Sequence, residues 1–444
     1  MDTPNTNGTT NDRGSAVDSV YTTIDPVGQF DGLHRTLSSA NDSVDHWLKT
    51  LGLEHDPFRL PYSELDFHLD EYYCEHEQFA ANLAPDHSVL YAKSGAGKTA
   101  ARKQIEAHFQ SAFRLEHVLA VPYLVPEHIA DAPPVSLSGH IPELAKALVL
   151  SAFVALAQHG NDFPNLDQDN ASRLAWYVEL CYPLHGTWQD DLTQAITERS
   201  LGQMLRSIGQ LHDPNLPPAM AGTVNADWLM RWKAWCATTN SPPSIPSVTN
   251  YQNLTEQHWD DILHLLKQIG IPKLIILVDG VDGKTGRHRI NRMNRVTQPF
   301  VDAILQGNLG PDTFCKLFLP LEIEPFVAHK LGKRIPMFRI QWGHASLREL
   351  ITRRLAQASG DMVRSLRQLI EPAVNDSFNL EEHLIEQSAF LPRTLIHSIE
   401  RLFAIHATQL SESQPATKIS FASVEALLQQ YNTNSHFGFV RPSP

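Results

Sequence analysis

The feature that most limits what this chain can fold into is a glycine-rich segment between a short apolar run and a helical pattern. Ser88–Ala92 has the length and composition of a buried strand, and a helix of about 13 residues is expected from Lys98. The joining segment, residues 92–99, reads Ala-Lys-Ser-Gly-Ala-Gly-Lys-Thr. It fits the phosphate-binding loop pattern, except that Ala92 replaces the first glycine. A strand, loop and helix in this order favour an α/β protein.

Each position of this loop has a chemical reason. Backbone N–H groups that converge at a helix N-terminus bind phosphate, and the helix dipole favours the negative charge. Gly97 lets the backbone approach without a Cβ, Lys98 reaches the β- and γ-phosphate oxygens, and the Thr99 hydroxyl ligates Mg²⁺. The sequence therefore predicts binding of ATP with Mg²⁺. The residues expected to contact the nucleotide are Lys93, Ser94, Gly95, Ala96, Gly97, Lys98 and Thr99.

A second apolar run, residues 274–278, ends in a carboxylate far downstream of the loop. A carboxylate at the end of a buried strand can hold a metal, so we expect Asp279 to join Thr99 as a magnesium ligand. Asp282, three residues later, is placed to orient or deprotonate the attacking water. The predicted catalytic residues are therefore Asp282 and Lys98.

The rest of the chain alternates apolar runs with helical patterns, which predicts a parallel sheet covered by helices on both faces. The expected fold is a three-layer α/β core with a parallel five-stranded sheet, a helical insertion and an all-helical C-terminal domain. That last domain opens at a capping-box pattern formed by Ser346 and Glu349. The five strands are expected in the segments 88–92, 115–125, 273–278, 315–319 and 337–340.

Composition and pattern also divide the chain into regions. Residues 1–44 are rich in Asn, Thr, Ser, Asp and Gly, which is typical of a disordered tail. The other expected regions are N-terminal linker helices at 45–86, the core at 87–342 with an insertion at about 160–250, the helical domain at 343–435, and a tail at 436–444.

The insertion stands out because it combines many tryptophans with many prolines. Trp228, Trp232 and Trp235 fall on one face of a helix. One interpretation is a small insertion that packs its own core, and the other is a surface that binds a partner.

Several segments resemble known ATPases. Asp279-Gly280-Val281-Asp282 resembles the Asp-Gly-hydrophobic-Asp-Glu signature of STAND and NACHT ATPases, a branch close to the AAA+ superfamily. The Gly52-Leu53…Asp56-Pro57-Phe58 entry is similar to bacterial AAA+ ATPases related to replication initiators and to secretion or transposition ATPases. Phe390-Leu391-Pro392-Arg393 resembles their second sensor, at the start of a lid helix. The resemblance implies a P-loop NTPase fold in which Arg393 contacts the γ-phosphate.

The resemblance leaves three functions open. The first is a STAND-like AAA+ ATPase that acts as a nucleotide-dependent switch, with a protein partner or self-association through the lid or the insertion. The second is a DNA-associated ATPase of the initiator or transposition type. The third is a nucleotide-bound interaction module without hydrolysis, because Gly283 stands where the signature has Glu.

Charge and composition bear on these alternatives. The net charge of −13 weighs against nucleic acid as the main partner. Arg287, Arg289, Arg292 and Arg295 are expected either on a solvated helix face or against phosphate, of nucleic acid or of a neighbouring subunit's nucleotide. Four scattered cysteines without a CxxC pair indicate reduced thiols, and no apolar run approaches the ~20 residues of a membrane span. We therefore expect a cytoplasmic protein without membrane contact.

Overall fold

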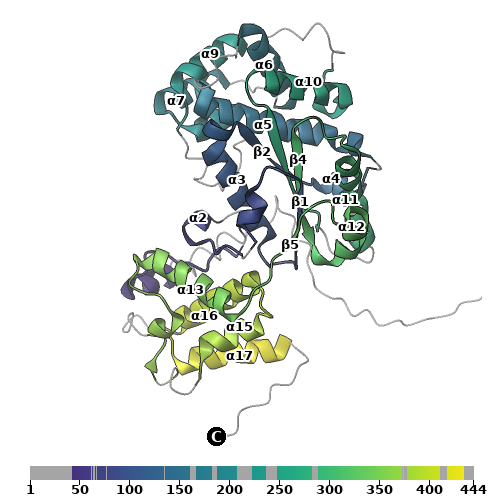
Figure 1. The fold of residues 1–444 in the computed structure, drawn as a ribbon. Helices are drawn as coiled ribbons and strands as arrows, with labels where there is room; N and C mark the ends of the chain where they lie inside the picture. Colours follow the sequence, from purple (N-terminus) through teal and green to yellow (C-terminus); the bar gives the residue numbers. More distant parts are fainter. Residues whose placement is uncertain are drawn as a thin grey trace, which may run out of the picture.

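The protein is described here from a computed structural model, in which five parallel strands form one sheet (Figure 1). The strands are β1 (Ser88–Ala92), β2 (Val118–Leu124), β3 (Lys273–Asp279), β4 (Thr313–Pro320) and β5 (Met337–Arg339). Their order across the sheet is β2-β3-β4-β1-β5, and every neighbouring pair is parallel. The α/β class and the parallel five-stranded sheet agree with the sequence. The structure describes residues 43–434 except 62, 64–65, 67, 77, 135, 161–166, 183–187, 208–222, 237–247, 283–288, 373, 375–377 and 411–417.

Helices cover both faces of the sheet because the strands are apolar along almost their whole length. Helix α3 (Lys98–Glu116) packs on the face to which Leu90 and Ala92 of β1 point. The alternate residues of β1, Val89 and Tyr91, face a larger core on the other side. Helices α5 (Ile141–His159), α10 (Glu256–Gln268), α11 (Arg289–Gln306) and α12 (Glu324–Leu331) pack in that core.

The described part of the insertion consists of helices at the end of the molecule farthest from the C-terminal helices (Figure 1). Trp228 and Trp232 are only 0% and 2% exposed and stack on each other, and Phe153 of α5 packs against both rings. The insertion therefore shares one core with α5 instead of enclosing a separate one. The Trp188 side chain and the prolines of the insertion lie outside the described residues. The helices of this region are α6 (Gln168–Cys181), α7 (Trp188–Glu198), α8 (Leu201–Ser207) and α9 (Ala226–Cys236).

The C-terminal region is helical and has a hydrophobic core of its own. Its elements are α13 (His344–Ser359), α15 (Leu380–Gln387), α16 (Pro392–Gln409) and α17 (Phe421–Asn434). A helix over residues 43–50 and the chain as far as Phe58 pack into the same core, where Trp47 lies edge-on against Phe403. The predicted cap of α13 is corrected: the helix begins at His344, and the Ser346 hydroxyl accepts the Gly343 N–H (3.0 Å) while Glu349 pairs with Arg353.

Short elements connect these units. They are α2 (Leu69–Tyr72), α4 (Glu127–Asp131) and the 3₁₀ turns Ala80–Leu83, Leu137–His140, Tyr251–Asn253, Leu321–Ile323 and Leu366–Leu369. One segment, Leu137–His159, is long and apolar enough to cross a membrane, but 61% of its most apolar window is buried inside the protein. The segment therefore packs as a core helix in this structure.

Candidate phosphate-binding site

The glycine-rich loop runs from the end of β1 into α3 at the carboxyl edge of the sheet. Gly95 and Gly97 have φ of +79° and +96°, a region that L side chains avoid, so the turn requires both glycines. Gly97 is the N-cap of α3, and its carbonyl accepts the Ala101 N–H (2.9 Å). The first N–H groups of α3 have no partner within their own helix and are therefore available to an anion.

The two predicted carboxylates lie directly opposite the loop side chains. The Thr99 hydroxyl donates to Asp279 Oδ2 (2.8 Å), and Lys98 Nζ lies 3.0 Å from Asp282 Oδ2. The sheet order explains this meeting, because β4 alone separates β1 from β3 and parallel strands end at the same edge. The structure thus brings together the four residues that the sequence predicted for metal binding and catalysis.

Asp279 is a buried carboxylate with three polar contacts. It is 2% exposed, and burial raises its pKa above the ordinary value. Arg102 Nε at 3.4 Å, the Thr99 hydroxyl and the Gly280 N–H (2.8 Å) each oppose that rise. Sequence analysis did not single out Arg102. The available signal was its position four residues after Lys98, on the same face of α3.

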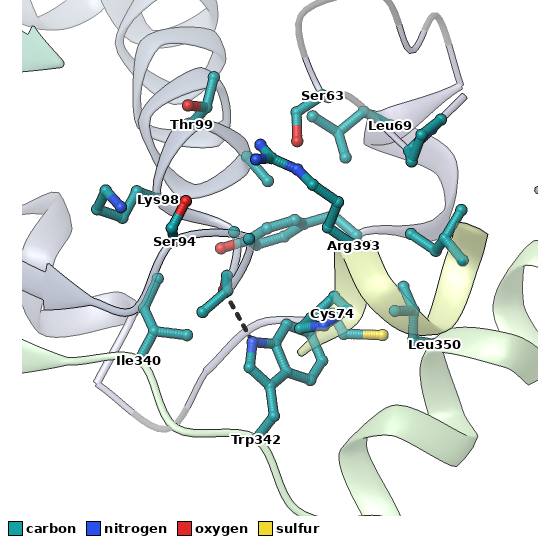
Figure 2. Close-up of a pocket in the computed structure, with 18 of the residues that line it drawn as sticks. Ser63, Leu69, Cys74, Ser94, Lys98, Thr99, Ile340, Trp342, Leu350 and Arg393 are labelled. Atoms are coloured by element: carbon teal, nitrogen blue, oxygen red, sulfur yellow. Dashed lines mark hydrogen bonds between the residues drawn. The ribbon is translucent and has the colours of Figure 1, made fainter. Parts of the chain in front are cut away.

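A cavity of about 440 Å³ opens over the loop (Figure 2). Its walls come from the core, from the C-terminal helices and from the chain between Pro61 and His76, called the N-terminal segment below. Figure 2 shows the Arg393 side chain extending into the cavity on the side of Thr99 and Ser63. The Arg393 backbone N–H donates to the Gly95 carbonyl (3.2 Å), so the start of α16 rests directly on the loop. The lining includes Ser94, Gly95, Ala96, Gly97, Lys98, Thr99, Asp279, Asp282, Trp342, Arg354 and Arg393.

One predicted loop residue lies apart from the cavity. The Lys93 side chain is exposed and is not part of the cavity wall, whereas its carbonyl accepts the Ala96 N–H (3.1 Å). Lys93 therefore shapes the loop through its backbone.

The N-terminal segment forms a wall that the sequence did not reveal. Tyr72 and Tyr73 line the cavity, and the guanidinium of Arg354 lies 4.2 Å from the centre of the Tyr72 ring. Arg354 Nη2 also donates to Asp66 Oδ2 (2.8 Å), and both side chains of this pair are 5% exposed. Helix α13 thereby holds a segment almost 300 residues away in sequence, and no local pattern could indicate that contact.

The arginine segment after β3 is partly engaged within the protein. Arg289 lies 3.6 Å from Glu322, and Arg292 lies 3.6 Å from Asp131, while Arg295 is exposed. Arg287 and Gly283 lie outside the described residues. Arg289 and Arg292 are thus paired with carboxylates of the same chain, and Arg295 is the one of these three arginines on an exposed surface.

Among the described residues, one group of side chains has the geometry of a second metal site. His344, Glu382 and Glu386 place ligand atoms within 4.8 Å of one another, but Arg348 already donates to Glu382 (2.5 Å). The three cysteines whose surroundings are described, Cys74, Cys181 and Cys315, are buried free thiols.

Comparison of the chain with protein-family models, with curated proteins and with solved structures found no match. What the site can do therefore follows from its own residues and their geometry.

Proposed function

We propose that this chain binds ATP with Mg²⁺ in the cavity over the loop and is an ATPase of the AAA+ type, similar to STAND proteins. One observation carries the proposal: Lys98 and Thr99 of the loop contact Asp282 and Asp279, and all four residues line one cavity. Its volume, about 440 Å³, lies within the ~300–1,000 Å³ typical of small-ligand sites.

The donor atoms at the metal side suit magnesium. Mg²⁺ prefers oxygen ligands together with substrate phosphates, and the Thr99 hydroxyl lies 2.8 Å from the Asp279 carboxylate. Thr99 and Asp279 would hold the ion, which neutralises charge on the β- and γ-phosphates when bound. Arg102 Nε lies 3.4 Å from the same Asp279 oxygen that accepts the Thr99 hydroxyl.

Lys98 and Asp282 change partners in this scheme. Lys98 Nζ lies 3.0 Å from Asp282 Oδ2. The phosphate oxygens of a bound nucleotide would compete for the same ammonium group and would free the Asp282 carboxylate. Asp282 would then orient or deprotonate the attacking water.

The helical C-terminal region gives the site its regulatory role. Arg393 reaches the cavity from α16, so a bound γ-phosphate would hold this region against the core. Exchange or hydrolysis of the nucleotide would remove this one contact and loosen the region, which would change the surface offered to a protein partner or a second copy. We place this nucleotide-dependent switch in the cytoplasm.

One set of measurements tests the proposal. Calorimetry with ATP and ADP in the presence of Mg²⁺ should show binding, and phosphate release should show turnover. Asp282→Asn should keep binding and reduce turnover at least tenfold, since it removes the carboxylate that activates water. Turnover stimulated by DNA would favour the DNA-associated ATPase. Binding without turnover would favour the interaction module, and the absence of binding to either nucleotide would reject the proposal.

A further inference from the structure

Trp342 joins the phosphate-binding loop to the helical C-terminal region. It lies between β5 and α13, and its indole Nε1 donates to the Ala96 carbonyl (2.8 Å), the bond drawn in Figure 2. The preceding carbonyl, that of Gly95, accepts the backbone N–H of Arg393 (3.2 Å). Two consecutive carbonyls of the loop are thus held by groups from the C-terminal part of the chain.

The ring of Trp342 also contacts both neighbouring hydrophobic cores. It packs against the core beneath α3 and against the core of the C-terminal helices. Within the described ranges, no other partly buried apolar side chain packs against both of these cores. A movement of the loop relative to the helices must therefore shift this ring.

The hydrogen bond to Ala96 fixes the direction of one loop peptide. A peptide group is planar and trans, so when the Ala96 carbonyl points to the indole, the Gly97 N–H points to the opposite side. Gly97 follows in the left-handed region with φ +96°, and a Cβ there would lie 4.0 Å from the Trp342 ring. Converging loop N–H groups are what bind phosphate, so fixing this peptide prepares the loop for its ligand.

We propose that Trp342 is a positioning residue that holds the loop ready for nucleotide phosphate and couples occupation of the loop to the helical C-terminal region. The inference rests on the proposed nucleotide site and names how that site is linked to its regulatory part. Arg393, by contrast, acts on the γ-phosphate through its side chain. Loss of the Trp342 hydrogen bond should therefore weaken the binding of ATP and of ADP equally. Loss of the Arg393 side chain should weaken the binding of ATP more than the binding of ADP.

Trp342→Phe is the direct test because it keeps an aromatic ring and removes the N–H donor. Trp259→Phe is the matched control, since Trp259 Nε1 also donates to a backbone carbonyl, that of Leu309 (3.1 Å), but within the α10 region of the core. Calorimetry with Mg²⁺·ADP should show affinity about fivefold weaker for Trp342→Phe, the factor expected for one neutral hydrogen bond, and unchanged for Trp259→Phe. Proteolysis supplies the second readout: ADP should protect α13 and α16 in the wild type and in Trp259→Phe, and much less in Trp342→Phe.

Wild-type affinity and wild-type protection in Trp342→Phe would overturn the inference. Equal losses in both variants would also overturn it, because they would indicate general destabilisation. Should Trp342→Phe not fold, hydrogen exchange of the wild type decides: Mg²⁺·ADP must slow exchange in peptides covering residues 340–350, and unchanged exchange there refutes the coupling. A wild type that binds neither nucleotide rejects the proposed function itself, a separate result.

Discussion

The sheet core and the helical C-terminal region build their parts of the cavity in opposite ways. In the core, Thr99 and Asp279 meet because Asp279 ends β3 and Thr99 follows the loop after β1, a parallel strand of the same sheet. Their positions therefore depend on the backbone hydrogen bonds between strands. In the helical region, the cavity wall depends on side chains such as Arg354, which hold a segment distant in sequence. The core is therefore suited to keep the loop and its carboxylates fixed, and the helical region is suited to move.

The two regions also differ in what their buried arginines contact. Arg102 lies beside Asp279, which lines the cavity over the loop. Arg354 pairs with Asp66 and its guanidinium donates to the Pro57 carbonyl (2.5 Å), so it stabilises the attachment of the N-terminal segment. The four predictions below test whether the two regions differ in this way.

The largest effect is expected at Arg354. Arg354→Ala leaves Asp66 buried without its partner, and breaking one side of a buried pair costs about 3–5 kcal/mol. Chemical denaturation should show this loss, with the N-terminal segment exchanging its amide hydrogens first. Arg353→Ala, at a half-exposed neighbour on the same helix, should cost less than about 1 kcal/mol. Similar costs for the two variants would contradict the role given to Arg354.

The second prediction concerns pH, to which one buried group in each region should respond in opposite directions. Burial lowers the pKa of His140, in the core, from 6.5 to about 4. Below pH 6.5 the unfolded chain then binds a proton that the folded protein does not, so the core loses stability as pH falls from 6.5 to about 4. Burial raises the pKa of Asp56, in the helical region, from 3.8 to about 6. The folded protein holds this proton longer, so the helical region loses stability as pH rises from about 4 to 6.

Each effect reaches roughly 3 kcal/mol across its full window, at about 1.4 kcal/mol per unit of pKa shift. Hydrogen exchange at pH 5 and pH 7, corrected for the intrinsic rate, should show the core less protected at pH 5 and the helical region less protected at pH 7. His140→Gln should reduce the pH dependence of protection in the core, and Asp56→Asn should reduce it in the helical region. If protection changed in the same direction in both regions, the prediction would be wrong.

The same contrast explains what sequence could predict. All five strands were expected, because apolar runs flanked by helical patterns report burial locally. The meeting of Thr99 and Asp279 was expected because a loop motif and a strand-end carboxylate imply one sheet edge. Trp342 and the wall built from the segment near Tyr72 were not expected. They depend on contacts between distant segments with no periodicity, and a single tryptophan in a linker carries no pattern.

The third prediction concerns Lys98, the loop residue that the core contributes to the site. Lys98→Ala removes the charge that faces the phosphates, a contact of about 1.5–3 kcal/mol, and ATP and ADP affinity should both fall roughly tenfold or more. Lys98 also pairs with Asp282, so a thermal melt must accompany the calorimetry. Lys267→Ala, on the exposed surface of α10, is the control and should bind as the wild type does. A folded Lys98→Ala protein with unchanged affinity would refute the assignment of the loop.

The smallest effect is expected at Arg393, the contribution of the helical region to nucleotide recognition. Pro392 occupies the first turn of α16, where its missing N–H costs nothing, and so places Arg393 at the loop. The side chain extends into the cavity on the side of Thr99 and Ser63, where it would meet the third phosphate of ATP in the proposed site. Arg393→Ala should therefore weaken ATP binding roughly three- to tenfold, and leave ADP binding almost unchanged.

The matched control is Arg401→Ala on the same helix, and Arg393→Lys should restore part of the preference for ATP. Competition of ATP against a fluorescent ADP analogue gives the ratio of the two affinities directly. An equal loss for both nucleotides, or none for either, would assign Arg393 to packing within the helical region. In that case Trp342 and the backbone bond to Gly95 would be the remaining links between that region and the loop, and the switch would respond to occupation of the loop rather than to the third phosphate.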